Sequence, residues 1–342
     1  MLTNERAIFI DPPSMDYYQD RLFDINDKNL NRDGTLLPIL RLRSLLNKQG
    51  IKVRTADYLF NATSSDKVAD YYSFGILNNY TNIKNFPNIR LRGFVIMEPP
   101  VTRPKIYRFL PELTKYFDQV FVHNVEGDGY SFKNVDRSKL RTFFWPQPHD
   151  NVIDQYWNNT LRENRIVAIS SRHIPFSLSG ELYSKRIEVM LNFAKSEKID
   201  LFGKGWDKWW TYKSTWLPNL LNYKKLISIY RGPCESKHEV LSRYKFSLCF
   251  ENMTMQGYLT EKIFDCFYAG CVPIYLGAKN ISKLIPPDSF IDYRKFSSAQ
   301  ELLNHIMTLS DNEILLMKQA GKNFIQSIIY KKYYDSLISI FE

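Results

Sequence analysis

The stretch that decides the fold is residues 244–277, which read YKFSLCFENMTMQGYLTEKIFDCFYAGCVPIYLG. The apolar run 246–250 predicts a buried strand, and the apolar residues of 258–268 return at helical spacing and predict a helix. A second apolar run, 271–276, predicts another strand, which Gly277 ends. A strand, a helix and a strand in this order are the repeating unit of a parallel sheet whose faces are covered by helices.

The same alternation extends in both directions along the chain. Further strands are expected at 7–10, 51–55, 93–97, 119–124, 166–169, 199–203 and 289–293. Further helices are expected at 36–46, 181–195, 299–309 and 311–329. Gly50 follows the first of these helices and is placed to end it.

One stretch, 145–159, breaks the rhythm because it opens on Trp-Pro-Gln-Pro and continues with polar residues. We interpret it as a linker between two domains, an N-terminal one over 1–155 and a C-terminal one over 156–320. Residues 321–342 are expected to form a C-terminal helix that packs back on the N-terminal domain. The predicted fold class is therefore α/β, with two Rossmann-like domains facing an interdomain cleft that serves as the ligand site.

Composition and charge narrow the class of protein without choosing a function. The 342 residues carry 46 Lys and Arg against 36 Asp and Glu, a formal net charge of +10 that favours anionic partners such as nucleotides. The charges are spread out and no nucleic-acid-binding motif is present, so nucleic acid is not the expected partner. No apolar run is long enough for a membrane span, and the opening residues 1–7 do not resemble a signal peptide. Four cysteines make no disulfide scaffold, which leaves a cytoplasmic location as the expectation.

The loop between the first two elements of the decisive stretch carries most of the chemistry. Gly257 permits a tight turn, and the helix that follows offers free N–H groups to an anion. Lys262 lies in the first turn of this helix, where a lysine is unfavourable for the helix dipole but suits a bound phosphate. The alternative is a solvated lysine on an exposed helix face.

These residues also carry a family resemblance. The segments YKFSLCFEN (244–252), GYLTEKI (257–263), AGCVPIYLG (269–277) and PDSFI (287–291) closely resemble the donor-binding motif of the α1,3/α1,4-fucosyltransferase family, glycosyltransferase family 10, in its bacterial form. MEPP (97–100) and FDQVF (117–121) are similar to the acceptor-domain pattern of that family. The resemblance is strong over 240–295, fair over 90–150 and weak elsewhere.

The resemblance implies the GT-B fold and an inverting transfer of L-fucose from GDP-fucose to a sugar hydroxyl. Such a transfer needs a base for the attacking hydroxyl and cations for the leaving diphosphate. By the family pattern Glu98 is the candidate general base, with Glu126 as its rival. Lys262 and Arg186 are the candidate diphosphate contacts, with Lys185 or Arg172 as alternatives to Arg186.

The family pattern also assigns Tyr258, Glu261 and Asn252 to the ribose and sugar pocket. Two departures from the pattern are Met253, where many members have serine, and the tryptophans 206, 209 and 210, which either shape a ligand pocket or cover core. A second nucleotide-linked deoxysugar as donor, or a non-catalytic protein that binds glycans or nucleotides, remain the alternatives.

No cofactor or metal is expected, because no His or Cys set has ligand spacing and because GT-B enzymes generally offset phosphate charge with side chains. The implied acceptor is O3 of GlcNAc or glucose in a surface glycan such as lipopolysaccharide or a glycosylated protein. The basic and aromatic run 330–334 is expected either to pack as helix or to touch an anionic membrane from the cytoplasmic side. The linkage, the acceptor and the oligomeric state stay open at this level.

Overall fold

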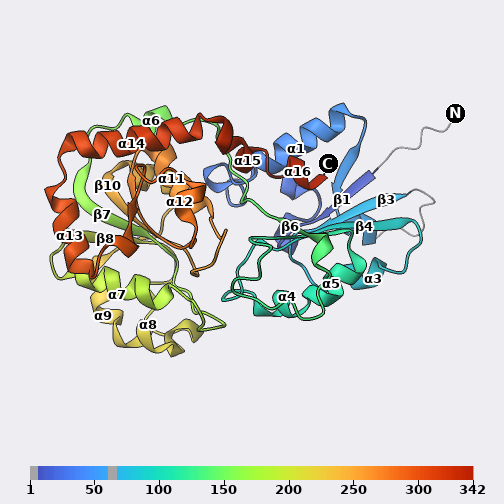
Figure 1. Ribbon diagram of the computed structural model, residues 1–342, viewed down its shortest axis with the longest axis horizontal. Helices are drawn as coiled ribbons and strands as arrows, with labels where there is room; N and C mark the ends of the chain where they lie inside the picture. Colours follow the sequence, from blue (N-terminus) through green and yellow to red (C-terminus); the bar gives the residue numbers. More distant parts are fainter. Residues whose placement is uncertain (1–6, 61–67, 342) are drawn as a thin grey trace. The chain divides into compact units, whose positions relative to one another are not determined.

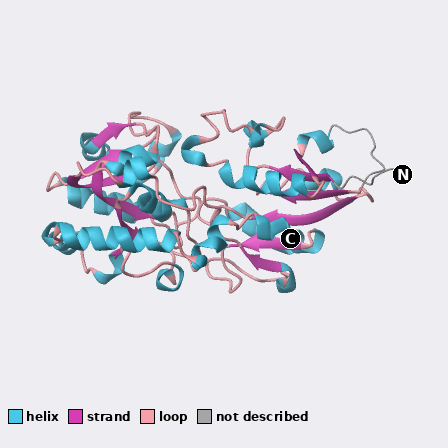
Figure 2. Ribbon diagram, turned by 90° about the horizontal axis from the view of Figure 1, so that it is seen from above, coloured by secondary structure: helices cyan, strands magenta, loops and turns pink. Residues whose placement is uncertain are grey.

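A computed structural model describes residues 7–60 and 68–341 of the chain. Most of the stretch 1–7, on which the expectation of no signal peptide rests, lies outside the described residues. The chain forms two compact units, one made of residues 1–148 together with 331–342 and the other of residues 149–330. Each unit contains a six-stranded sheet in which all neighbouring strands are parallel, and this confirms the predicted α/β class (Figure 1, Figure 2).

The sheet of the first unit has the strand order β2-β1-β3-β4-β5-β6. Its strands are β1 Ala7–Asp11, β2 Lys52–Thr55, β3 Ala69–Ser73, β4 Ile89–Val95, β5 Gln119–Val122 and β6 Leu140–Thr142. Its helices are α1 Leu37–Lys48, α2 Asp57–Phe60, α3 Tyr80–Ile83, α4 Pro104–Arg108, α5 Leu110–Tyr116, α15 Lys331–Tyr334 and α16 Ile338–Phe341. Burial of apolar side chains on both sheet faces gives two core clusters, as a parallel sheet with covered faces requires.

The sheet of the second unit has the order β12-β11-β10-β7-β8-β9. Its strands are β7 Glu163–Ile169, β8 Ile199–Phe202, β9 Tyr230–Gly232, β10 Tyr244–Phe250, β11 Val272–Leu276 and β12 Ile291–Asp292. Its helices are α6 Asp154–Trp157, α7 Tyr183–Ala194, α8 Leu217–Leu221, α9 Tyr223–Ile229, α10 Lys237–Ser242, α11 Glu261–Ala269, α12 Ile281–Leu284, α13 Ala299–Thr308 and α14 Asp311–Ile325. Helix α7 packs with α9 and α13, whereas α11 packs with α6, α10 and α14, and the two groups lie on opposite sides of the sheet (Figure 1).

The decisive stretch forms the expected strand, helix and strand, but its helix begins later than predicted. Helix α11 starts at Glu261 because Thr260 is extended, with φ −112° and ψ −167°. The backbone N–H of Thr260 bonds to the Glu251 carboxylate instead of extending the helix backwards. The start of α11 is therefore fixed by a side chain at the end of β10.

The expected C-terminal helix over 321–342 is wrong as a single helix. Helix α14 ends at Ile325, and the chain then turns so that the Tyr330 hydroxyl donates to the carbonyl of His149 at 2.7 Å. Two short helices follow, α15 and α16, which belong to the first compact unit. Within the basic and aromatic run 330–334, Tyr330 and Tyr333 are both 1% exposed, so these two rings face the interior. Among the described residues no helix has the length and apolar character needed to cross a membrane.

Candidate functional site

The chain order of the second sheet reverses between β7 and β10. From β7 the chain proceeds outward to β8 and β9, and then returns to β10 and proceeds the other way to β11 and β12. In a parallel sheet a ligand crevice forms outside the carboxyl ends of the strands at such a switch point. The residues that follow these two strand ends are Ser170 and Glu251, and the candidate site is built around them.

A buried carboxylate, Glu251, organises the loop between β10 and α11. The side chain is fully buried, with no exposed surface. Its Oε1 accepts the Thr260 backbone N–H at 2.9 Å, and its Oε2 accepts the Thr260 hydroxyl at 2.9 Å and the Lys262 ammonium at 2.9 Å. In this structure Glu251 therefore has a structural role, because it caps a backbone amide of the loop.

Lys262 stands in the first turn of the nine-residue helix α11, which is the terminus where the helix dipole is positive. Its Nζ also donates to the Thr260 hydroxyl at 2.9 Å, and a quarter of its side chain is exposed. Burial by itself would lower the pKa of Lys262. The nearby carboxylates of Glu251 and Glu261 have the opposite and larger effect, so the pKa lies above its ordinary value. The ammonium is therefore charged and fixed in position, with one side open.

Arg186, on α7, joins the two strand ends at the switch point. One of its nitrogens donates to the Ser170 hydroxyl at 3.0 Å, and the other donates to the carbonyls of Phe250 at 2.7 Å and Glu251 at 2.8 Å. The side chain is buried, and burial lowers its pKa. In this structure the guanidinium therefore holds the loop in place, and its charge lies directly behind the strand ends.

A third cation, Arg172, lies in the loop after β7, and the sequence pattern indicates it only as an alternative to Arg186. It is fully buried, and its Nη1 donates to the Lys208 carbonyl at 2.7 Å. Its Nε and Nη2 have no hydrogen-bond partner within residues 7–60 and 68–341. These two nitrogens form the edge of a guanidinium that pairs with both oxygens of a carboxylate or phosphate. The signal in the sequence is its position three residues after a buried strand.

The electrostatics of neighbouring groups show that these cations gather in one place. The pKa of His173 is lowered to about 4 by desolvation and then by Lys213, Arg186 and Lys262, although the residue as a whole is exposed. Burial lowers the pKa of Lys213, and Arg172 lowers it further. Five basic residues therefore act on one another at the carboxyl ends of β7 and β10. Such a group suits a ligand with two or more negative charges.

Three other predicted residues, Asn252, Tyr258 and Glu261, border this group. The carbonyl of Asn252 accepts the Leu182 N–H at 3.0 Å, which ties the loop to the start of α7, and its side chain is half-buried. Tyr258 is 1% exposed and lies near enough to Arg186 to act on its charge.

Glu261 is the first residue of α11 and lies between two lysines, 3.6 Å from Lys237 and 4.0 Å from Lys262. Burial alone would raise the pKa of Glu261, but these lysines lower it. Lys237 in turn pairs with Asp265 at 2.7 Å, and His238 pairs with the same carboxylate at 3.0 Å. Lys237 and His238 could not be predicted from the motif, because they come from a different helix, α10.

The three tryptophans that depart from the family pattern, at 206, 209 and 210, differ in their burial. Trp206 is 4% exposed, donates from its indole N–H to the Ser170 carbonyl, and is part of the core of the second unit. Trp209 and Trp210 are exposed. A small cavity lies beneath Trp206, and its lining includes Ser170, His173, Tyr183, Arg186, Trp216 and Asn219.

In the first unit, Glu98 lies three residues beyond the end of β4 and is half-buried. The backbone on which it sits is held from two directions. The His123 Nε2 bonds to the Met97 carbonyl at 2.8 Å, and the Tyr107 hydroxyl donates to the Glu98 carbonyl at 3.1 Å. Desolvation lowers the pKa of His123 to about 4, so this histidine is neutral and acts as a donor. The rival Glu126 is exposed.

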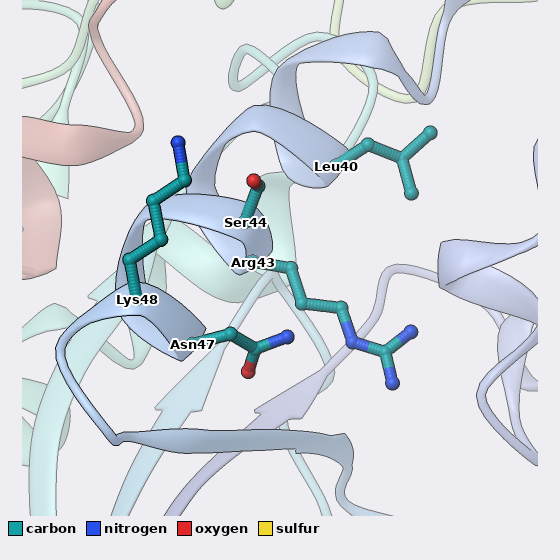
Figure 3. A pocket seen from close by; sticks show the side chains of 5 residues that line it. All are labelled: Leu40, Arg43, Ser44, Asn47 and Lys48. Carbon is teal, nitrogen blue, oxygen red and sulfur yellow. The ribbon is translucent and has the colours of Figure 1, made fainter.

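Another hollow in the first unit lies on the surface of α1. Figure 3 shows its five lining side chains, Leu40, Arg43, Ser44, Asn47 and Lys48, which project from successive turns of this one helix. The hollow is wide open to solvent and all of its lining side chains come from α1, so it is not a built site. Within the described part of the chain, no group of three or more His, Cys, Asp or Glu side chains is arranged to hold a metal ion.

Comparison with known proteins gives matches over a range that includes the loop between β10 and α11. Residues 176–319 match the sequence model described as "Glycosyltransferase family 10 (fucosyltransferase) C-term". An α-(1,3)-fucosyltransferase of Helicobacter pylori is 34% identical over 105 residues, which cover 31% of this chain and 22% of that protein. An α-(1,4)-fucosyltransferase of Arabidopsis thaliana is 44% identical over 77 residues, or 22% of this chain and 19% of that protein. The chain therefore aligns with about a fifth of the length of these relatives.

Solved structures support the fold over nearly the whole chain. A crystal structure of an α1,3-fucosyltransferase with GDP matches 99% of this chain and 91% of that chain, with a TM-score of 0.52 and 15% identity. A sucrose-phosphate synthase from Thermosynechococcus elongatus matches 98% of each chain, with a TM-score of 0.62 and 11% identity. These likenesses confirm the expected GT-B class of two α/β units. Over residues 176–319 the chain is therefore similar to the C-terminal domain of glycosyltransferase family 10, the fucosyltransferase family.

Proposed function

We propose that the protein is an inverting glycosyltransferase that moves L-fucose from GDP-fucose to a glycan hydroxyl. The observation that carries the proposal is the lysine at the start of α11, which Glu251 and Thr260 hold within a segment that matches the fucosyltransferase family. A fixed ammonium at a helix N-terminus is suited to a diphosphate. The donors named with related structures, GDP and GDP-fucose, agree with this ligand class.

In the proposed reaction, the acceptor hydroxyl oxygen attacks C1 of fucose and the bond from C1 to the diphosphate oxygen breaks. GDP leaves with the electron pair of that bond, and its growing negative charge requires cations. Lys262 and Arg186 supply positive charge in this proposal, and Arg172 offers a further unpaired guanidinium edge. Glu261, Tyr258 and Asn252 are assigned to the ribose and the sugar.

The proton of the acceptor hydroxyl goes to Glu98 as general base. The support is positional: the carboxylate follows the end of a parallel strand, and the contacts of His123 and Tyr107 fix its backbone. A base must lie within hydrogen-bond reach of its proton, so a fixed backbone favours the role. The proposed acceptor is O3 of GlcNAc or glucose, and no metal or cofactor is included in the proposed reaction.

The first experiment is calorimetric titration of the purified protein with GDP, UDP, CMP and dTDP, each alone and as a sugar conjugate. Selective binding of GDP and GDP-fucose is expected. Preference for another nucleotide would retain the site and reject fucose as the donor, and absence of all binding by folded protein would reject the transferase.

The second experiment concerns the base. The substitution Glu98→Gln should abolish transfer from GDP-fucose to GlcNAc or glucose acceptors. It should leave GDP affinity unchanged, because Glu98 belongs to the first unit and the donor-binding candidates belong to the second. The matched control is Glu126→Gln, which should transfer normally. Normal turnover by Glu98→Gln would remove it as base, and loss in the control alone would assign the role to Glu126.

A further inference from the structure

The segment after β8, residues 204–225, presents an unusual set of large side chains to solvent. The exposed fractions range from 38% for Leu220 to 71% for Leu221. Trp209, Trp210, Tyr212 and Leu217 are each about 60% exposed or more. Six large exposed apolar or aromatic side chains within residues 209–221 are more than the scattered exposure that is normal on a folded protein, and such a group marks an interaction site.

The inner side of the same segment is firmly packed. Trp206 bonds to the Ser170 carbonyl and lies in the core, and Trp216 packs edge-on against Tyr183 with 6.3 Å between ring centres. Asn219 is buried and donates to the Lys213 carbonyl at 3.0 Å. Helices α8 and α9 lie against α7 on one side of the second sheet (Figure 1). The outward aromatic and leucine side chains therefore project from an anchored support.

The charge of this segment is strongly one-sided. It contains five lysines, 204, 208, 213, 224 and 225, and one acid, Asp207, so its formal charge is +4. Four of these lysines are exposed and Lys213 is half-buried. Apolar and aromatic side chains among lysines match the chemistry of a membrane interface, where rings lie at the headgroup level and lysines reach anionic headgroups.

We propose that residues 204–225 form a binding surface for an anionic lipid bilayer. The charge argues for this occupant over a second copy of the chain, because two such surfaces brought together would place +4 against +4. The surface is separate from the run 330–334, whose tyrosines 330 and 333 are buried. The proposal needs no assumption about fucosyl transfer.

The test is co-sedimentation of the full chain with vesicles of phosphatidylcholine alone and of phosphatidylcholine mixed with phosphatidylglycerol. The expected result is binding to the mixed vesicles that added salt weakens, because the Debye length shortens. Replacing Trp209 and Trp210 with serine, or Lys224 and Lys225 with glutamate, should each weaken binding by roughly tenfold or more.

The matched control is Leu315→Gln with Leu316→Gln on α14, which removes two leucines that are 49% and 61% exposed without touching the surface. This variant should bind mixed vesicles as the original chain does. Circular dichroism of each variant establishes that it is folded.

Three results would overturn the proposal: no binding to mixed vesicles, equal binding to neutral vesicles, or equal loss in the control variant. A fourth would assign the surface to contacts between copies, namely self-association of the free protein that only the Trp209 and Trp210 variant loses. Titration of the same variants with GDP measures donor binding separately. The vesicle result does not depend on nucleotide binding, so failure of the membrane proposal and failure of the proposed transferase can be distinguished.

Discussion

Replacing Lys262 with methionine tests the proposed diphosphate site most directly. The substitution keeps the length of the side chain and removes the ammonium that Glu251 and Thr260 hold at 2.9 Å. A hydrogen bond to a charged group contributes about 1.5–3 kcal/mol. Since about 1.4 kcal/mol corresponds to a tenfold change, GDP affinity should fall by about 10- to 150-fold.

The same substitution also affects stability, and the two effects have to be separated. Among the residues that the structure describes, it leaves the fully buried Glu251 with its Thr260 hydrogen bonds alone. Because a quarter of the Lys262 side chain is exposed, we expect a loss of about 1–3 kcal/mol in the free energy of unfolding, less than the roughly 3–5 kcal/mol lost when a fully buried pair is broken. Adding Glu251→Gln removes the stranded charge and should restore part of the stability but none of the GDP affinity.

The assay is calorimetric titration with GDP and with guanosine, which has no phosphate, alongside urea unfolding. Guanosine affinity should not change in the Lys262→Met variant. The control is Lys245→Met, which removes a lysine with similar exposure that pairs with Asp311 at 2.5 Å. Unchanged GDP affinity, an equal loss for guanosine, or recovery of GDP affinity in the double variant would each refute the reasoning.

Three further outcomes are expected. Arg172→Met should weaken GDP binding about tenfold without lowering the urea midpoint, because it removes a buried and incompletely paired cation; unchanged GDP affinity would argue against a phosphate contact. The pKa of His123 is about 4 in the folded chain against an ordinary 6.5, so the unfolded chain binds more protons between these values, and about 3 kcal/mol of stability should be lost as the pH falls from 6.5 to 4. His123→Phe should flatten that dependence in urea unfolding, and an unchanged slope would assign it to other groups. Dialysis against a chelator should leave fucosyl transfer largely intact, and loss that added metal restores would overturn a reaction carried by side chains alone.

Five of the six strands of the second sheet could be predicted because their apolar runs end at glycine or polar residues, whereas the three-residue strand β9 was not expected. The strands 246–250 and 271–276 were expected within a few residues of β10 and β11. Strand β3 escaped prediction although all five of its residues are buried. It reads Ala-Asp-Tyr-Tyr-Ser, and its acid is neutralised by a tertiary contact in which Arg90 pairs with Asp70 at 2.7 Å. A short local pattern cannot contain that information.

In the candidate site, the positions of residues within a motif could be predicted, whereas their long-range contacts could not. The position of Lys262 in the first turn of a helix follows from the local pattern, and α11 places it there. Its contact with Glu251, eleven residues earlier, depends on how the loop folds back over the strand end. The partners of Arg186 lie up to 65 residues away along the chain, so its role as a brace between β7 and β10 could not be predicted from spacing.

The first unit is built from two separate segments of the chain, 1–148 and 331–342, and this affects the order in which the units can fold during synthesis. Leu337, Ile340 and Phe341 belong to one of its core clusters, and the Phe341 ring lies 4.0 Å from that of Tyr72. The ribosome makes these residues after the whole of 149–330, so the first unit emerges early but receives part of its core only after the second unit has been made. Until then the second unit, which is one continuous segment, has all of its residues and can reach its final fold before the first.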